Sequence, residues 1–462
     1  MSRNTRWFKY GTASAFIVLT ILLFLFHARW KQSDLHHLRL RKPVRPQIIH
    51  VSPMDQEKFI TYLPHSGFHN QRIALINALV LAKATNRTLI MPELNVGAAT
   101  YWRPSNVLAG RMDTCPDKIK AQGGLSVEGC FDYRKYVPIP VSSMLDVASI
   151  RSLGINIMQR RDMHLNYFER YWSIPPQDNE SQVLMIDDPV RYSYQIYETA
   201  QMPSKLQKFE YRLNLADIQT RPEPFVVFGS LFGSHRLQLL EGSKLAWVRS
   251  YLRKELGISH PVVQEKSLDL VSRLGGPAQF AAIHVRQGDG VFKKLLKTTV
   301  KRVRETLEHR VQQGEITAAI NATIQRLGAL STTQEARQQR LDECLKQQYV
   351  HSRLQIIYMA TDAKKPREKF AELYNEFACL FTLSDFPDIM EQTTSSVLGF
   401  SAEEKYYPHV SHLGSLLFPM IDAEVTSHGS FFVGTPKSTF STYVQYRNSR
   451  FLEFYPQNIS HT

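Results

Sequence analysis

Long hydrophobic runs, cysteine and nucleic-acid-binding motifs are all scarce in this 462-residue sequence. It contains no zinc-finger spacing, no RNA-recognition sheet signature and no basic heptad region. The formal net charge is +14, but residues 1–50 alone carry +8 and leave +6 for residues 51–462. Most of the basic excess therefore lies beside the one apolar run, where it suits anionic lipid or sets topology, and nucleic acid is not an expected partner.

That apolar run, residues 11–26, contains no charged residue and has basic residues on both sides. It predicts an uncleaved transmembrane signal anchor behind a short tail, residues 1–10. A cleaved signal peptide is the alternative, but no small-residue cleavage site follows the run directly. Residues 27–55 are basic, contain proline and lack periodicity, so we expect an extended stem.

The four cysteines fall into two local pairs, Cys115 with Cys130 and Cys344 with Cys379. An even count suits two disulfides in an oxidising compartment, although four cysteines allow three pairings.

Glycosylation triplets also favour a lumenal C-terminal side, so we expect a single-pass type II protein of the Golgi or ER membrane. Asn86 also begins such a triplet, but we expect it to be buried. The candidate glycosylation sites are Asn179, Asn321 and Asn458.

The remaining sequence predicts an α/β protein. Short apolar strands are each followed by a turn and a helix, which is typical of parallel, doubly wound sheets. We expect an N-terminal Rossmann-like domain over residues 56–240 and a C-terminal one over residues 241–462. Residues 292–352 are rich in Lys, Arg, Glu and Gln at helical spacing and predict a helical insertion, whereas residues 101–130 predict a long loop.

A polar loop, HSGFHN, stands between a predicted strand at residues 58–63 and a predicted helix. The helix carries apolar residues at three- and four-residue spacing, which predicts one buried face. Ligands of open α/β sheets bind beyond the carboxyl ends of the strands, so this loop would line a ligand crevice at a helix N-terminus suited to anions. A capped helix with a polar start is the alternative. The candidate ligand-facing residues are Gly67, Phe68, His69 and Asn70.

Two later strand–helix junctions carry similar chemistry. In AIHVRQGDG, the strand ends at His284 and Val285, and Arg286 stands at its carboxyl edge, where a guanidinium can bind a phosphate through two parallel hydrogen bonds. His284 and Arg286 are candidate nucleotide-sugar-binding residues. A turn salt bridge between Arg286 and Asp289 is the alternative. In FFVGTPKSTFSTYV, Ser438 and Thr439 begin a helix, which suits a phosphate or an ordinary N-cap.

Together these segments resemble a known family. GFHNQRIALINALVLAKATNRTLIMP, AIHVRQGD and FFVGTPKSTFSTYVQYR are similar, in order and spacing, to the three motifs of the GDP-fucose protein O-fucosyltransferase family, in its fungal-type form. The resemblance covers roughly residues 59–446, with the insertion outside it. It implies two Rossmann-like domains facing a cleft, the GT-B arrangement, and transfer of fucose with inversion from GDP-fucose to a Ser or Thr hydroxyl of a protein acceptor.

The resemblance also implies roles for individual residues. Asn70 corresponds to the loop residue near the reacting centre, and Arg286 to the arginine that neutralises the departing β-phosphate. Asp422, in SLLFPMIDAEV, corresponds to the carboxylate that faces guanine; taken alone it could also be a surface acid. The residues of the nucleotide-holding turn are Ser438, Thr439 and Phe440.

No Asp-x-Asp triplet occurs, the pattern with which many glycosyltransferases hold Mn²⁺. Arg286 and a helix N-terminus can stabilise a departing diphosphate instead, so we expect no metal and no cofactor besides the donor substrate. The base that deprotonates the acceptor stays open among Asp289, as a catalytic candidate, His69 and the leaving phosphate. A catalytically silent lumenal relative that binds glycans or proteins, and a transferase using another nucleotide sugar, are the alternative functions.

Overall fold

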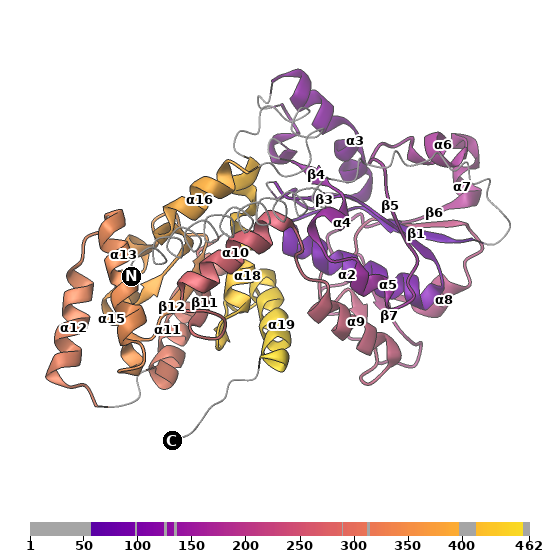
Figure 1. The fold of residues 1–462 in the computed structure, drawn as a ribbon. Coiled ribbons are helices and arrows are strands. Elements are labelled where there is room, and N and C mark those ends of the chain that lie inside the picture. The colour runs from indigo at the N-terminus through magenta and orange to yellow at the C-terminus, as the bar shows by residue number, and fades with distance from the viewer. Residues whose placement is uncertain are drawn as a thin grey trace, which may run out of the picture. The chain divides into compact units, whose positions relative to one another are not determined.

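The computed structural model describes residues 57–97, 99–123, 127–133, 136–288, 290–311, 315–396 and 413–455 (Figure 1). All of them belong to one compact unit, Pro53–Thr462. The expected tail at residues 1–10, the expected anchor at residues 11–26 and the expected stem at residues 27–55 all lie outside the described residues. Within the described residues, no helix is both long enough and apolar enough to span a bilayer.

A five-stranded sheet, entirely parallel, organises the first half of the chain in the order β5-β2-β1-β9-β6. Its three central strands, FITY, TLIM and FVVF, are buried along their whole length, as expected for a sheet with both faces covered. The strands are β1 (Phe59–Tyr62), β2 (Thr88–Met91), β5 (Ile157–Gln159), β6 (Val183–Ile186) and β9 (Phe225–Phe228).

Two helices of this half differ from the sequence prediction. Helix α2 is buried on nearly all sides rather than along one face, because the sheet, α8, α9 and α19 all pack against it. Asn86, which ends it in a left-handed conformation, is exposed and not buried. The expected loop at residues 101–130 contains a 17-residue helix, α3, despite Pro116 in its interior. The helices are α2 (Phe68–Thr85), α3 (Ser105–Ala121), α4 (Val141–Met144), α5 (Ala148–Arg151), α6 (Tyr167–Trp172), α7 (Asn179–Gln182) and α8 (Leu215–Gln219).

Two smaller sheets, which the sequence did not predict, accompany the first. One is parallel, in the order β10-β7-β8, and the other is an antiparallel pair, β3 with β4. Their strands are β3 (Leu94–Asn95), β4 (Pro138–Ile139), β7 (Tyr194–Tyr197), β8 (Tyr211–Asn214) and β10 (Leu237–Gln238).

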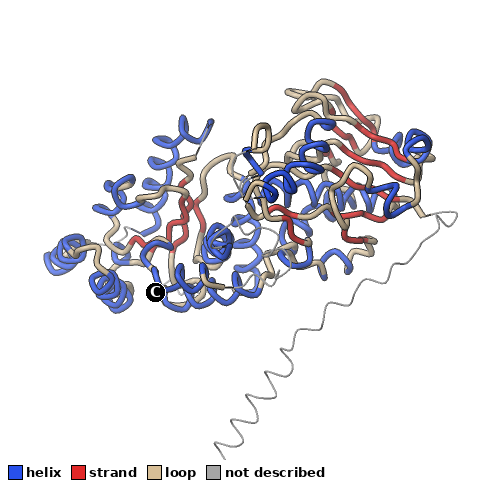
Figure 2. The backbone as a smooth tube through the Cα atoms, turned by 90° about the horizontal axis from the view of Figure 1, so that it is seen from above, coloured by secondary structure: helices blue, strands red, loops and turns tan. Residues whose placement is uncertain are grey.

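The second half builds a four-stranded parallel sheet, in the order β13-β12-β11-β14. Strands β11, β12 and β14 lie at strand signals expected from the sequence, whereas β13 was not expected. Figure 2 shows the strands in red bordered by helices in blue. The strand–helix pattern predicted one helix after each strand, but β12 is followed by two short helices, α14 and α15, which are separated at Phe370. The strands are β11 (Ala281–Val285), β12 (Ile357–Thr361), β13 (Leu380–Phe381) and β14 (Phe432–Val433).

The insertion is helical and is tied to this sheet. Its third helix, α13, carries Cys344, which is disulfide-bonded to Cys379 immediately before β13. The helices of this half are α9 (Lys244–Glu255), α10 (Pro261–Arg273), α11 (Gly290–Val311), α12 (Ala318–Ala329), α13 (Gln334–Gln347), α14 (Pro366–Lys369), α15 (Ala371–Glu376), α16 (Pro387–Thr394), α18 (Phe418–Ser427) and α19 (Thr439–Phe454).

Helix α9 connects the two halves through its C-terminal carbonyl groups. The last carbonyls of a helix have no partner within it. Here Arg72 of α2 donates to the carbonyls of Leu252, Arg253 and Leu256 at 3.3, 2.8 and 2.7 Å. Arg447 of α19 donates to a fourth carbonyl, that of Lys254, at 2.7 Å. Two guanidinium groups from opposite ends of the chain therefore cap one helix.

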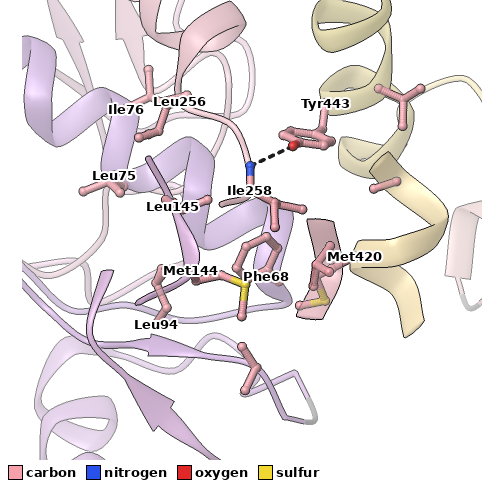
Figure 3. Packing of buried hydrophobic residues seen from close by; sticks show 14 of the residues in the cluster. Phe68, Leu75, Ile76, Leu94, Met144, Leu145, Leu256, Ile258, Met420 and Tyr443 are labelled. Atoms are coloured by element: carbon pink, nitrogen blue, oxygen red, sulfur yellow. Dashed lines mark hydrogen bonds between the residues drawn. The ribbon is translucent and has the colours of Figure 1, made fainter. Parts of the chain in front are cut away.

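The residues that follow α9 complete this junction. Gly257 brings its backbone against Arg447, since a Cβ there would meet the guanidinium carbon at 2.7 Å. The backbone N–H of Ile258 donates to the Tyr443 hydroxyl at 3.0 Å, the bond drawn in Figure 3 among the surrounding apolar side chains. The Tyr443 hydroxyl in turn hydrogen-bonds the buried carboxylate of Glu424. Helices α18 and α19 are thus fixed to the segment that enters the second half.

We expect Arg72→Leu to lower the free energy of unfolding by about 3 kcal/mol, because it leaves buried carbonyl groups of α9 without a donor. Urea unfolding followed by tryptophan fluorescence measures this loss. Arg151→Leu, which removes an exposed arginine at the end of α5, is the matched control and should change little. Equal unfolding midpoints for the two variants would contradict the capping role.

Candidate functional site

The loop after β1 uses its polar residues for different purposes. Gln71 turns inward, where its amide donates to the carbonyls of Ser66 and Asn95 at 3.0 and 3.1 Å and accepts from the Asn95 N–H at 2.9 Å. Arg72 caps α9, as described above. The half-buried side chain of Asn70 makes no hydrogen bond to any described residue. Of Asn70, Gln71 and Arg72, Asn70 is therefore the one whose side chain the described residues leave available to a ligand.

His69 stands where the two halves meet. Its ring lies 4.9 Å from the ring of Tyr443 and 5.3 Å from those of Phe68 and Phe440, and both its ring nitrogens are buried without a hydrogen-bond partner in the described chain. Burial, followed by the charges of Arg72, His284 and Arg286, lowers the pKa of His69 to about 3. The ring is neutral at physiological pH, which makes it a poor general base there.

At the end of β11, hydrogen bonds join the strand to the turn after β14. Thr435 Oγ1 donates to the His284 carbonyl at 2.8 Å and accepts from the Arg286 N–H at 2.9 Å. The His284 ring stacks on Phe440 at 4.3 Å, and its Nδ1 lies 2.7 Å from Ser441 Oγ. Burial and then Arg286 lower the pKa of His284 to about 3. His284 therefore supports the turn as a neutral ring.

Arg286 leaves the strand edge with its guanidinium over the ring of Phe292, 4.4 Å from the centroid, and with Nε 4.0 Å from Asp362. Asp289, the expected partner in a turn salt bridge and a predicted catalytic residue, lies outside the described residues. Asp362 also accepts from the N–H groups of Gln287 and Gly288, at 2.6 and 3.0 Å. This carboxylate therefore organises the whole loop after β11.

Sequence reasoning missed Asp362 and Phe292. Asp362 follows β12 directly, in YMATDA, so the strand-end argument that selected Arg286 could have found it. Phe292 carried no such signal, because it was assigned to a solvated insertion.

Ser438 is the N-cap of α19 rather than a free hydroxyl. Its Oγ is buried and accepts from the Ser441 N–H at 3.4 Å, so the ordinary cap considered from the sequence is present. The N–H groups of Thr439 and Phe440, in the first turn, have no partner in the described chain. Gly434 lets the turn approach α19, since a Cβ there would fall 2.5 Å from Ser441 Cβ. An anion here would meet backbone donors.

Asp422, on α18, is partly buried and accepts a 2.5 Å hydrogen bond from the Tyr358 hydroxyl. Burial raises the pKa of Asp422 to about 7, although the bond from Tyr358 lowers it. Asp422 is thus a partnered carboxyl and not a surface acid.

An open hollow of about 490 Å³ lies beyond the carboxyl ends of β11 and β12. Asp362 and the Arg286 loop form one wall, and lysines that follow β12 form the other. The lining residues are Gln287, Gly288, Asp362, Lys364, Lys365, Glu368 and Lys369.

The remaining predicted sites have separate positions. Cys115 is bonded to Cys130, which holds the end of α3 to the chain 15 residues later, and Cys344 is bonded to Cys379. Asn321 is exposed on α12, whereas Asn179 begins α7 and Asn458 lies outside the described residues. No group of three His, Cys, Asp or Glu side chains able to hold a metal ion occurs in the part of the chain that the structure describes.

Parallel α/β sheets, with a cation at one strand end and free N–H groups at a neighbouring helix start, define a nucleotide-binding α/β protein. The sequence matches the profile of the GDP-fucose protein O-fucosyltransferase family over residues 59–450. The chain therefore belongs to this family and is a glycosyltransferase. No match was found among curated proteins.

Solved structures similar to this chain include POFUT1 in complex with GDP, at 15% identity and a TM-score of 0.39, covering 86% of this chain and 96% of that one. POFUT1 in complex with GDP-fucose matches at 13% identity and a TM-score of 0.39, covering 87% and 96%. The fucosyltransferase NodZ from Bradyrhizobium matches at 13% identity and a TM-score of 0.35, covering 85% and 93%. At these TM-scores the likenesses add nothing to the assignment, which rests on the family match.

Buried neutral histidines make the site sensitive to acid. The pKa of His65, like those of His69 and His284, is lowered to about 3, mainly by burial. Between about pH 6.5 and pH 3 the unfolded chain binds protons that the folded chain does not, so stability falls as pH falls through this window. We expect His69→Phe to reduce the loss of stability between about pH 7 and about pH 5 by about 2 kcal/mol.

Urea unfolding of the wild type and His69→Phe at about pH 7 and about pH 5 measures the difference in slope. His235→Gln, which alters an exposed histidine, should retain the wild-type slope. A parallel loss of stability in the wild type and His69→Phe would show that this imidazole is not held neutral.

Proposed function

We propose that this protein transfers fucose from GDP-fucose to a Ser or Thr hydroxyl of a protein acceptor, with inversion and without a metal ion. The observation that carries the proposal is Arg286 at the carboxyl end of β11, joined through Thr435 to the turn after β14. The N–H groups of Thr439 and Phe440 at this turn have no partner among the residues that the structure describes. A fixed cation beside a helix N-terminus is suited to a diphosphate.

In the proposed reaction, the bond between the fucose anomeric carbon and the β-phosphate oxygen breaks while the acceptor oxygen attacks from the opposite face. The bonding electrons remain on the phosphate, and the acceptor proton passes to a base. Arg286 and the α19 N–H groups stabilise the negative charge that develops on GDP, which is the largest single contribution available in such a site. The low pKa of His69 leaves Asp289 or the leaving phosphate as the base.

Asp422 and Asn70 complete the proposed site. Guanine presents N–H donors along one edge, and an ionised Asp422 can accept them through the oxygen that Tyr358 does not use. With a pKa of about 7, the carboxyl ionises across the physiological range. The amide of Asn70 has no hydrogen-bond partner in the described part of the chain, and the residue neighbours His69, so it is proposed to orient the sugar at the reacting centre.

The proposal includes the secretory pathway: a single-pass type II protein of the Golgi or ER membrane with its catalytic part in the lumen. Two disulfides support it, since disulfides persist in oxidising compartments. The exposed triplet at Asn321 would be accessible to glycosylation there.

We expect GDP to stabilise the protein in excess EDTA, whereas UDP does not. A ligand at about 100 times its Kd adds about 2.7 kcal/mol, enough for a clear rise in the melting temperature. Differential scanning fluorimetry with GDP and UDP, with and without added Mn²⁺, measures this. Stabilisation that appears only after Mn²⁺ is added would contradict the metal-free site, and equal effects of GDP and UDP would contradict guanine recognition.

We expect Arg286→Ala to reduce GDP release from GDP-fucose by about 10²-fold or more with an unchanged melting temperature, because the lost interaction forms with the developing charge. Arg286→Lys should recover a minor part, since an ammonium cannot form the planar two-point contact. Coupled nucleotide-release assays measure turnover, and Arg151→Ala, an exposed arginine on α5, is the control. Wild-type turnover by a normally folded Arg286→Ala protein would remove the support for this mechanism.

A further inference from the structure

A second hollow, of about 570 Å³, adjoins the one beside Arg286 and shares Glu368 and Lys369 with it. Its lining residues come from α11 and from the α14–α15 segment, and both contribute to the same apolar cluster as β11 and β12. The positions of α11 and α15 near these two strands can be followed in Figure 1. We name the two hollows together the α11–α15 groove. The residues of the second hollow are Leu296, Lys297, Val300, Lys301, Arg304, Glu368, Lys369, Phe370, Ala371, Glu372 and Leu373.

The groove has an apolar floor and cationic edges. Leu296, Val300, Phe370 and Leu373 belong to the apolar cluster beneath it, fully or partly buried. The side chains along its length that carry positive charge are Lys297, Lys301, Arg304, Lys364, Lys365 and Lys369. A recess of this kind accommodates the side chains of an extended polypeptide while its edges select for negative charge.

Most of the acidic residues along the groove are already engaged. Asp362 accepts from the Gln287 and Gly288 N–H groups, and Glu368 is paired with Lys365 at 2.9 Å. Among the described residues, Glu372 is the other acid that lines the groove.

The cations divide into paired and unpaired groups. Lys301 and Arg304 form exposed pairs with Glu305 and Glu308 on α11, at 3.7 and 3.9 Å, and such pairs are weak. Three lysines have no carboxylate within ion-pair distance in the described part of the chain. They are Lys297, Lys364 and Lys369.

We propose that the α11–α15 groove binds an acidic stretch of the acceptor polypeptide. This inference rests on the proposed function, because the groove opens beside Gln287 and Gly288, next to Arg286, so a chain lying in it leads to the reacting centre. A recessed, apolar floor between two helices suits a polypeptide better than a bilayer surface. Phe370 in the floor is buried and offers no ring face for stacking a nucleic-acid base.

The test uses the full-length protein and a fluorescein-labelled peptide in which one serine is flanked by aspartate and glutamate. The triple variant K297E/K364E/K369E should bind this peptide about tenfold or more weakly than the wild type in fluorescence anisotropy. K118E/K205E/K244E changes the charge equally at exposed lysines in the first half and in α9, and should bind like the wild type. Binding should weaken as ionic strength rises, and a lysine-flanked peptide should not bind.

Two results would overturn the proposal: an equal loss of peptide binding in both triple variants, or unchanged peptide binding in both. So would vesicles containing phosphatidylserine that bind the wild type but not K297E/K364E/K369E, because the groove would then bind lipid. GDP-induced stabilisation, measured in the same samples, reports on the nucleotide site independently. If GDP fails to stabilise the wild type while the acidic peptide still distinguishes the variants, the proposed transferase mechanism fails and the peptide groove stands.

Discussion

The capping of α9 by two arginines is the interaction on which the arrangement of this protein depends. Arg72 enters from α2, beside the first sheet, and Arg447 from α19, the last helix of the chain, and both donate to carbonyls that α9 cannot satisfy itself. Because unpaired buried carbonyls are costly, both helices are held to the same turn of backbone. Helices α2 and α19 are thereby both held to the end of α9, near the candidate site.

This shared capping of α9 explains the surroundings of the loop after β1. Arg72 lies three residues after His69. Burial of the His69 ring, followed by the charges of Arg72, His284 and Arg286, lowers the pKa of this imidazole and keeps it neutral. His69, Phe440 and Tyr443 pack together where the sequence predicted an open crevice, so side chains fill the junction between the halves at this point. Asn70 follows His69 on α2, and its amide makes no hydrogen bond to the residues that the structure describes.

Much of the fold could be predicted from sequence because its central strands are short apolar runs followed by turn residues, as in β9 and, apart from His284, β11. Helix α3 was missed because Pro116 and neighbouring glycines resemble a loop, whereas tertiary packing of Leu108, Met112 and Ile119 stabilises the helix. Arg286 was found by its position at a strand end. The role of Arg72 could not be found, since its partners lie about 180 positions later, beyond the reach of any local pattern.

The disulfide between Cys344 and Cys379 has a consequence for how the insertion can vary. It fixes α13 to the start of β13, while Arg340 of the same helix holds the end of α12 through the carbonyls of Leu327 and Leu330. Changes of length or sequence on the exposed face of α12 would therefore leave the returning chain anchored before it enters β12. With the returning chain anchored in this way, the outer part of the insertion can differ between related proteins without displacing β12, the strand that Asp362 follows.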